Sequence, residues 1–375
     1  MSNRCCAIPF DAVGGHKSAF FYGEAARDGR STLQKKTTAW EVMYYLAMEI
    51  AKDGTLAQDT TAPRSHDEVR AKFVHAAGKL SVFTPSLVSI RFPDNYATSS
   101  AALKPYMNYR NNWVIIEAGA PDRSAVVVPL FNELFDGAEE LQGFTEEYDT
   151  GIWGIGLIDE TSGMQKPCVM DIKIGFVRHS PVTPADKVAR MLKNEHNSLT
   201  RRTAIRICGS RRYIPTKASI EGSTPTWTCE RFGKDIGHAV SHERELSTCI
   251  RNFLSVRRSL AEVNENGEFI FPSESMDGMA HTEKAQMEKR MRGIRANLKS
   301  LVHFLESTPE GAFMLQHMAL VSTSVLLLYD AVASPRTAKL LFIDFARSTW
   351  RKFNFDEPTI GLIQGLKNLD KYLSM

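Results

Sequence analysis

The feature that most constrains the fold of this chain is a short apolar segment that carries an acid and a base two residues apart. Residues 167–175 have the sequence Pro-Cys-Val-Met-Asp-Ile-Lys-Ile-Gly, in which Asp171 and Lys173 stand among side chains typical of a buried strand. Because strand side chains alternate between faces, both charged groups should point to the same side of a sheet. Burying them is costly without a purpose, so we expect either a structural ion pair or a reactive site.

A second carboxylate interrupts another apolar run. Residues 340–346 have the sequence Leu-Leu-Phe-Ile-Asp-Phe-Ala, and Asp344 stands near the end of this run. Hard cations such as Mg²⁺ prefer carboxylate and phosphate oxygens, so an Asp in this setting suits a metal ligand beside a phosphate site. The alternative is an Asp that caps a turn or is satisfied within the core.

Positive charge is concentrated in one part of the chain. The net charge is only +3, yet between residues 187 and 217 the basic residues face a single acid, Glu195. Within this block, residues 183–186 combine an N-cap hydroxyl, a proline and an acid, which predicts a helix over 184–197. Lys187, Arg190 and Lys193 would share one stripe of that helix. The stripe suits a polyanionic ligand, and a solvated surface helix is the equal alternative.

Pattern and length predict an α+β fold of two packed lobes. Helical periodicity is clear at 40–50 and at 287–305, where a coiled coil is a weaker alternative. Stretches rich in β-branched residues, and alternating stretches, predict strands at 81–90, 126–130, 153–158 and 168–174. A turn cluster at 159–163 separates the lobes, which we expect to span 1–158 and 159–375. Segments expected to be insertions or surface loops are 51–77, 99–123 and 262–281.

Composition excludes several classes of protein. With 43% hydrophobic and 24% charged residues the chain is neither disordered nor fibrous. The cysteines lack the Cys-x-x-Cys spacing of a structural zinc site. The start of the chain lacks a secretion signal, and no apolar run approaches the ~20 residues that span a bilayer. We therefore expect a monomer in the cytoplasm and/or nucleus, without membrane insertion and without a stable nucleic-acid partner.

Several motifs resemble those of the inositol polyphosphate kinase family. Residues 167–175 fit its PxxxDxKxG signature, residues 323–330 resemble its SSLL element and residues 343–345 fit its IDF motif. Further segments extend the resemblance over most of the chain. They are 13–16 (VxGH), Lys35 with Glu41 and Tyr44-Tyr45 (KPxxxxxExxFY), 206–209 (RVCGM) and 365–369 (GLxNL).

The resemblance implies a reduced protein-kinase-like (ATP-grasp-like) fold, with ATP in the cleft and the inositol phosphate held by the C-lobe and its inserted basic helix. ATP would be bound by Lys35, Asp159 and Asp344, with Asp344 as the ligand of Mg²⁺. Asp171 would orient or deprotonate the attacking hydroxyl, with Lys173 as the second catalytic residue. The implied phosphate-binding residues of the substrate site are Lys173, Lys187, Arg190, Lys193 and Ser324.

The chain departs from the family pattern in places that affect substrate and site. Lys36 replaces a proline, which leaves Lys35 and Lys36 as alternative ATP-binding lysines, and Arg347 stands where relatives often have histidine. The sequence of residues 170–175, Met-Asp-Ile-Lys-Ile-Gly, favours a multikinase that phosphorylates inositol tris- and tetrakisphosphates. Segments 14–16, 83–85 and 178–179 instead resemble the hexakisphosphate kinases, which make pyrophosphates. An alternative of another class is a non-catalytic module that binds inositol phosphates or phosphoinositides.

Overall fold

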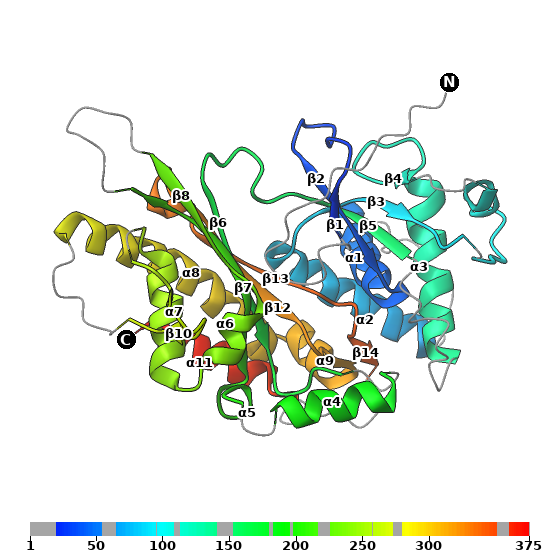
Figure 1. The fold of residues 1–375 in the computed structure, drawn as a ribbon. Helices are drawn as coiled ribbons and strands as arrows, with labels where there is room; N and C mark the ends of the chain where they lie inside the picture. Colours follow the sequence, from blue (N-terminus) through cyan, green and yellow to red (C-terminus); the bar gives the residue numbers. More distant parts are fainter. Residues whose placement is uncertain are drawn as a thin grey trace.

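The computed structural model contains two five-stranded antiparallel sheets, each at the centre of one lobe (Figure 1). Their strand orders are β1-β2-β5-β3-β4 and β13-β12-β6-β7-β8. This arrangement confirms the predicted two-lobed α+β fold. The structure describes residues 20–54, 65–94, 96–108, 113–140, 153–179, 183–195, 198–216, 226–256, 258–272, 280–350 and 360–374.

The first sheet and three helices form the part that we call the N-lobe. Its strands are β1 (Phe20–Tyr22), β2 (Thr32–Thr37), β3 (Leu87–Arg91), β4 (Val114–Ile115) and β5 (Trp153–Ile158). Its helices are α1 (Ala39–Asp53), α2 (Ser65–Leu80) and α3 (Arg123–Glu140), with short 3-10 turns at Ser81–Phe83 and Lys104–Asn108. Strand β5 and helix α1 lie where the sequence pattern predicts them, and the strand expected at 81–90 is a 3-10 turn followed by β3.

Two expectations for the N-lobe are wrong. Residues 126–130 belong to helix α3 and not to a strand, because Val126, Val127, Leu130 and Phe131 are all buried on the helix face that meets α1. Tertiary burial here outweighs the β propensity of valine. The polar segment 51–77 is not one long insertion, since its second half forms α2, which buries Phe73 between α1 and α3.

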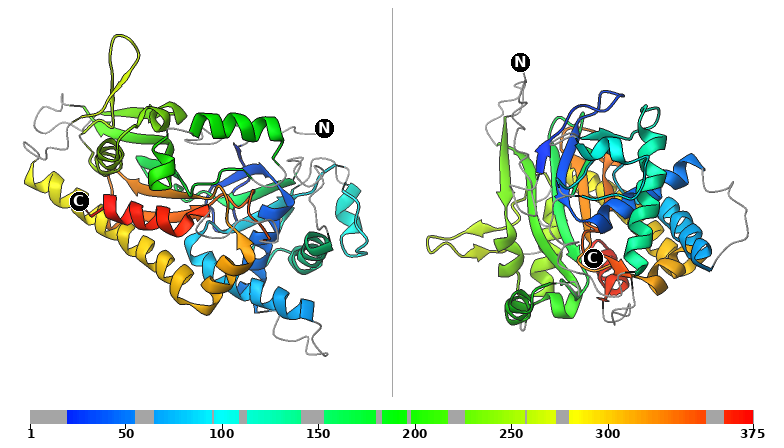
Figure 2. Two further views of the ribbon diagram at one scale, coloured as in Figure 1. Left: turned by 90° about the horizontal axis from the view of Figure 1, so that it is seen from below. Right: turned by 90° about the vertical axis from the view of Figure 1, so that its right-hand side faces the viewer.

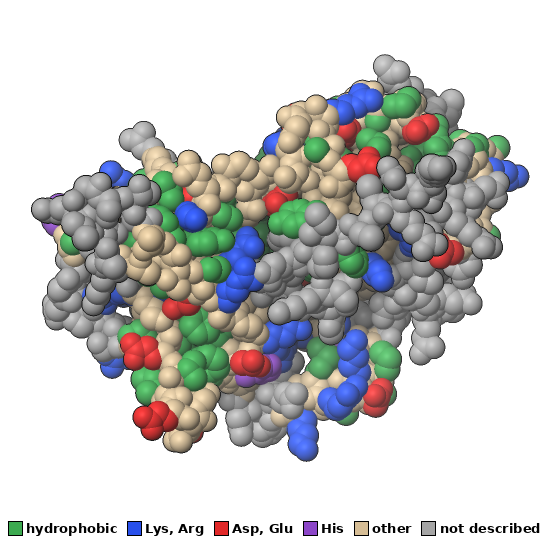
Figure 3. Space-filling model, turned by 45° about the horizontal axis from the view of Figure 1, so that its top comes forward, with side chains coloured by type: hydrophobic (Ala, Val, Ile, Leu, Met, Phe, Trp, Pro, Cys, Tyr) green, Lys and Arg blue, Asp and Glu red, His purple; other side chains and the backbone are tan. Residues whose placement is uncertain are grey.

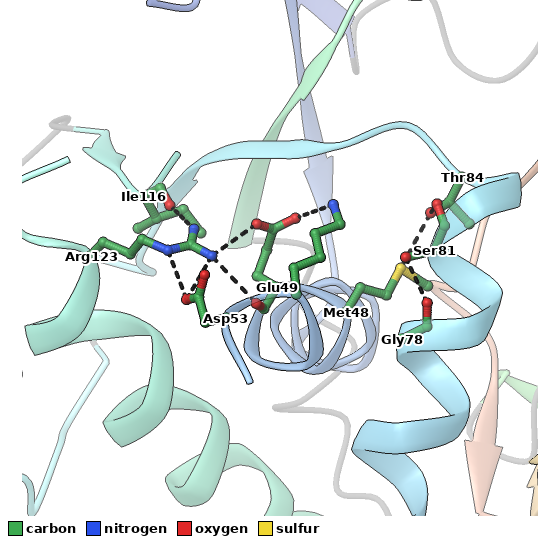
Figure 4. Close-up of polar contacts among 9 residues, drawn as sticks. Met48, Glu49, Asp53, Gly78, Ser81, Thr84, Ile116 and Arg123 are labelled. Carbon is green, nitrogen blue, oxygen red and sulfur yellow. Dashed lines mark hydrogen bonds and ion pairs between the residues drawn. The ribbon is translucent and has the colours of Figure 1, made fainter. Parts of the chain in front are cut away.

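A buried arginine ties α1 to the start of α3 (Figure 4). Arg123 donates hydrogen bonds to the carboxylates of Asp53 (2.9 Å) and Glu49 (3.1 Å) and to the carbonyl of Ile116. Charge-assisted hydrogen bonds of this kind are about twice as strong as neutral ones. The end of α1 is thereby held in a defined position, which matters because the same helix carries Glu41 at its other end.

The second sheet is the centre of the part that we call the C-lobe. Its strands are β6 (Pro167–Ile174), β7 (Ile205–Pro215), β8 (Trp227–Phe232), β12 (Ser324–Asp330) and β13 (Lys339–Ile343). Helices α7 (Glu243–Leu254), α8 (His281–Ser307) and α11 (Leu362–Tyr372) share a core with one face of this sheet, through side chains such as Met170, Ile172 and Leu301. The opposite face is therefore left for the site.

Smaller elements complete the C-lobe. They are α4 (Ala185–Glu195), α5 (Thr200–Thr203), α6 (Lys234–Ala239), α9 (Pro309–His317), β9 (Glu262–Val263), β10 (Phe269–Ile270), β11 (Met318–Ala319), β14 (Thr349–Trp350) and a 3-10 turn at Pro335–Thr337. Strands β9 and β10 make a hairpin inside the segment that we expected to be a plain loop, because Phe269 packs on Phe232 of β8. Helix α8 has the predicted core positions and packs within its own chain, which leaves the coiled coil without support.

Aromatic side chains join the two lobes into one core. Phe345, which follows Asp344, stacks on Tyr44 of α1 with ring centres 5.0 Å apart. Trp350 of β14 contacts Trp40, Phe73 and Phe135 from the N-lobe helices. The segment after Asp344 is thus clamped between the lobes, and the position of Asp344 depends on both.

Among the helices that the structure describes, none is both long enough and apolar enough to cross a lipid bilayer.

Candidate active site

The site is built on the face of the C-lobe sheet that the helices leave uncovered. Asp171 and Lys173 of β6 both point to this face, as their spacing predicts, because Cys168, Met170 and Ile172 occupy the helix side. Lys173 lies opposite Ser324 of β12. The strand ends at Gly175, whose φ of 101° is a left-handed conformation that favours glycine.

Asp344 lies at the end of β13 and is contacted by two lysines from different lobes. The Nζ of Lys35 lies 2.6 Å from its Oδ1, and the Nζ of Lys173 lies 2.6 Å from its Oδ2. Lys173 also donates to the carbonyl of Ser322 at 2.8 Å. Asp344 has a φ of 69°, a strained conformation for a non-glycine residue that costs about 1–2 kcal/mol. Strain of this kind clusters at functional sites.

Glu41 of α1 holds the N-lobe side of this arrangement. Its carboxylate, 1% exposed, lies 3.0 Å from the Nζ of Lys35 and accepts the backbone N–H of Phe345 at 3.2 Å and the hydroxyl of Thr37. One side chain therefore positions both Lys35 and the backbone that follows Asp344. Glu41 lies in a motif segment for which no role was expected, and an acid inside an otherwise apolar helix is the sequence signal that marks it.

The two carboxylates have opposite pKa shifts. Burial and the neighbouring Asp344 raise the pKa of Asp171 above its ordinary value, although Lys173 opposes the shift. Burial also acts on Asp344, but Lys173 and Lys35 outweigh it and hold the pKa of Asp344 far below its ordinary value. The same carboxylates keep both lysines protonated: against burial, Asp344 raises the pKa of Lys35 and of Lys173. Asp344 is therefore ionised at neutral pH, whereas Asp171 has a higher affinity for a proton.

Polar atoms beside Asp171 lack partners within the described part of the chain. They are Asp171 Oδ1 and Ser324 Oγ, both enclosed. The Ser324 hydroxyl lies near enough to Asp171 to lower the pKa of Asp171, although it makes no hydrogen bond of good geometry. Enclosed polar atoms normally form hydrogen bonds. A ligand with hydroxyl or phosphate groups would supply the missing ones.

An apolar surface continues the same sheet face away from Asp344. Val169, Leu328 and Leu341 form a cluster of their own, separate from the main core, with Leu326 and Ile343 packed against it. Val169, Leu328 and Leu341 are buried, whereas Leu326 and Ile343 are only partly buried, so a flat apolar group could pack against these last two side chains.

The structure brings some of the expected residues together and leaves others apart. Lys35 reaches the carboxylates, whereas Lys36, next to it on β2, is exposed. Asp159 lies just after β5, where its carboxylate accepts hydrogen bonds from the backbone N–H (2.9 Å) and hydroxyl (2.7 Å) of Thr161. These contacts give Asp159 a turn-stabilising role, and within the described residues they do not join it to the Lys35–Asp344 network.

The predicted basic helix is present as α4, from 185 to 195, on the outer surface of the C-lobe (Figure 2). Residues 196 and 197 lie outside the described part. Lys187, Arg190 and Lys193 are exposed, and Arg190 makes only a loose contact with Asp186 at 3.4 Å. The wider basic block does not lie on one surface, because Arg212 is fully buried on the helix side of the sheet.

The residues present suit a hard divalent cation only if a bound ligand also supplies some of the oxygen atoms that coordinate it. The available donors are carboxylate oxygens, which is the chemistry that Mg²⁺ and Mn²⁺ prefer. Within the described ranges, however, no group of three or more His, Cys, Asp or Glu side chains could hold a metal alone. Asp344 could therefore contribute one ligand, with phosphate oxygens completing the set, as is usual for nucleotide-bound Mg²⁺.

The site lies between two lobes and combines one carboxylate of lowered pKa, one carboxylate of raised pKa and two lysines. This combination suits a phosphotransferase. The family model described as inositol polyphosphate kinase matches residues 154–374, more than half of the chain. The chain therefore belongs to the inositol polyphosphate kinase family, a family of phosphotransferases, as its motifs predict.

Individual relatives are more distant. The inositol hexakisphosphate kinase 1 proteins of Mus musculus and Rattus norvegicus are each 25% identical over 224 residues, which cover 54% of this chain and 47% of the relative. The chain thus spans about half the length of the curated relatives it matches. Among solved structures, inositol phosphate multikinase Ipk2 from S. cerevisiae, in complex with ADP and Mn²⁺, is 16% identical with a TM-score of 0.40, covering 59% of this chain and 83% of that one.

Proposed function

We propose that this chain is an ATP-dependent kinase that transfers the γ-phosphate to a hydroxyl of an inositol tris- or tetrakisphosphate. The observation that carries the proposal is the meeting of Asp171, Lys173, Asp344 and Lys35 on one sheet face between the lobes. Phosphoryl transfer depends on positioning and on charge neutralisation, and these side chains offer both. Residues 1–158 form the ATP-binding lobe in this proposal, and residues 159–375 form the catalytic and substrate-binding lobe.

The nucleotide would lie with its base against Leu326 of β12 and Ile343 of β13. Lys35 would bind its phosphates, and Asp159 its ribose. Asp344 would hold the divalent ion, which supplies charge neutralisation on the phosphates when it is bound. Because Lys35 and Lys173 already touch Asp344, their ammonium groups need only small movements to exchange carboxylate for phosphate oxygens.

The acceptor would lie over Asp171. A carboxylate whose pKa is raised is a better general base toward a hydroxyl, because its affinity for the proton is closer to what the transfer needs. Lys173 and Ser324 would bind a phosphate next to the reacting centre, and Lys187, Arg190 and Lys193 of α4 would bind the others. The enclosed Oδ1 of Asp171 then gains its hydrogen bond from the substrate hydroxyl.

A hexakisphosphate kinase is the second candidate, because the curated relatives carry that name. The two candidates differ in the acceptor: hexakisphosphate has no free hydroxyl, and an ionised phosphate acceptor needs no base. The raised pKa of Asp171 therefore favours the hydroxyl acceptor. Purified protein should be incubated with ATP, Mg²⁺ and each inositol phosphate, and the products separated by chromatography. Pyrophosphate products from hexakisphosphate alone would refute the preferred substrate.

A non-catalytic binding module would bind inositol phosphates without consuming ATP. Such a module has no use for a metal-ligating acid or for a lysine held beside it. The same incubation distinguishes this class, because binding with no ADP formed from any inositol phosphate would contradict the kinase.

A further inference from the structure

Two consecutive arginines of β7 point to opposite faces of the C-lobe sheet. Arg212 lies on the helix side, where it donates to the carboxylate of Glu230 and to the carbonyls of Asn252 and Ser255. It thereby satisfies carbonyl groups at the end of α7, an ordinary structural role for a buried cation. Because side chains alternate along a strand, Arg211 lies on the other face, which is the face of Asp171 and Lys173.

Arg211 has a different environment from the other buried arginines. Only 7% of the residue is exposed, and its Nε is fully enclosed. Within the described ranges it has neither a hydrogen-bond acceptor nor an acidic partner. Among the other buried arginines that the structure describes, Arg123, Arg212 and Arg290 donate to carbonyl groups, and the first two also contact carboxylates. Arg178 resembles Arg211 in its enclosed Nε, but it has an interaction partner. Arg211 therefore stands apart as a buried cation whose charge the described chain does not balance.

The strand register places Arg211 close to the reacting centre. Asp171 lies opposite Gly209, and Val169 lies opposite Arg211, so Arg211 is the diagonal neighbour of Asp171 across the β6–β7 pair. Diagonal neighbours on one face lie about 7–8 Å apart. This distance leaves room for a phosphate group between the two side chains. On its other side Arg211 lies opposite Arg231 of β8, which adds positive charge and no counter-ion.

Position also decides which part of a ligand Arg211 can reach. Strands β12 and β13, with Asp344, lie on one side of β6, and β7 lies on the other. The nucleotide therefore belongs to the first side, and Arg211 belongs to the far side of the acceptor. Lys and Arg side chains gather in the middle of the face drawn in Figure 3.

We infer that Arg211 binds a phosphate of the inositol polyphosphate, on the side of the acceptor that faces away from the nucleotide. A guanidinium group stays charged at all working pH values and forms paired hydrogen bonds to phosphate. Leaving such a group buried without an anion is unfavourable, and a substrate phosphate removes that cost. The sheet then holds the substrate at two points, Lys173 beside the nucleotide and Arg211 beyond Asp171. This inference rests on the proposed function.

The test measures equilibrium binding of two probes, an inositol trisphosphate and inositol hexakisphosphate, by calorimetry in the presence of ADP. The variants are Arg211→Gln and a control with the same change of charge, Arg292→Gln. Arg292 is exposed on α8, on the opposite side of the sheet. We expect Arg211→Gln to raise the Kd of at least one probe about 10- to 100-fold. Arg292→Gln should leave both Kd values within about twofold, and neither variant should change the Kd of ADP.

A second measurement separates a binding role from a structural one. If Arg211 lacks a partner in the free protein, Arg211→Gln should unfold at the same or a higher temperature than the unmutated chain when no ligand is present. If the glutamine variant does not fold, Arg211→Lys takes its place, because it keeps the charge but loses the paired hydrogen bonds. A clear fall in Tm for both variants would assign Arg211 a structural role and overturn the inference.

Two negative outcomes remain distinguishable. If the unmutated protein binds a probe and Arg211→Gln binds it equally well, the role of Arg211 is wrong while the proposed substrate class stands. If the unmutated protein binds neither probe, the proposed function itself fails, and the role of Arg211 fails with it.

Discussion

The ammonium of Lys173 and the carboxylate of Asp344 lie 2.6 Å apart, although 171 residues separate them in the chain. Lys35, a further 138 residues upstream of Lys173, reaches the other oxygen of the same carboxylate. Two lobes are thereby joined at one acidic side chain. This junction places both proposed phosphate-binding lysines around the proposed metal ligand.

Replacing Asp344 by asparagine should abolish turnover while inositol phosphate binding persists. The amide keeps the shape of the side chain but loses the charge that a divalent ion and two lysines require. Turnover is measured as ADP formation, and binding by calorimetry. Retained turnover in Asp344→Asn would show that the metal ligand lies elsewhere.

The same substitution makes a prediction about acid stability. Because the folded pKa of Asp344 is lowered, its carboxylate stabilises the fold fully above the ordinary value of 3.8 and progressively less as the pH falls toward the folded value. The difference in urea midpoint between the unmutated chain and Asp344→Asn should therefore be constant from about pH 7 to 5 and shrink below the ordinary carboxyl pKa. A difference that grows on acidification would contradict the lowered pKa.

Asp171→Asn should lower kcat by about 10²- to 10⁴-fold, the usual contribution of a general base. It should also stabilise the free protein at neutral pH. A carboxyl group whose folded pKa is raised binds its proton more tightly in the folded state, so it destabilises the fold as the pH rises through that pKa. Thermal unfolding at pH 7 measures this, and a lower Tm for Asp171→Asn would be inconsistent with the raised pKa.

The pH profile of the unmutated enzyme should show the titration of Asp171. The rate kcat/KM should fall on the acidic side as Asp171 takes up a proton, with a midpoint above the ordinary carboxyl value of 3.8. The residual rate of Asp171→Asn should lack this limb. An unchanged acidic limb in the variant would assign it to another group.

Glu41→Gln should weaken ATP binding about tenfold, because Lys35 loses the carboxylate that positions it and a hydrogen bond to a charged group is lost. Glu49→Gln is a matched control, a buried acid on the same helix that pairs with Arg123. It should lower the free energy of unfolding by about 1–3 kcal/mol and leave the KM for ATP unchanged. Equal effects of both variants on ATP would remove the positioning role of Glu41.

Lys187→Ala and Arg190→Ala should raise the KM for the inositol phosphate more than the KM for ATP. Both residues lie on the exposed helix α4, so their attraction for phosphates is screened by salt. The increase should be largest at low ionic strength and shrink as salt is added. If neither KM changes at low salt, α4 does not form part of the substrate site.

Sequence patterns were most informative where local and tertiary requirements agree. Strand β6 and helix α8 follow simple periodicities because one face of each is buried along its whole length. Helix α3 was missed because three consecutive valines favour a strand, whereas burial against α1 decides for a helix. Helix α2 was overlooked for its polar composition, although Val69, Phe73, Ala76 and Leu80 repeat at helical spacing.

The site was partly predictable for a similar reason. Asp171 and Lys173 share a strand face by their spacing alone, so their proximity follows from local structure. The junction of Lys35, Glu41 and Asp344 joins residues 309 positions apart and depends on how the lobes pack. Arg211 and Arg212 are identical neighbours in the sequence, and only the register of β7 separates a structural arginine from one that faces the site.

The most direct test of the account is transfer of labelled γ-phosphate from ATP to an inositol trisphosphate by the purified chain in Mg²⁺, with Asp171→Asn and Asp344→Asn in parallel. The account predicts a labelled product with one more phosphate from the unmutated protein, and a large loss of that product in both variants while trisphosphate binding is retained. Binding of the trisphosphate by the unmutated protein without any labelled product from it, or equal labelling by all three proteins, would contradict it.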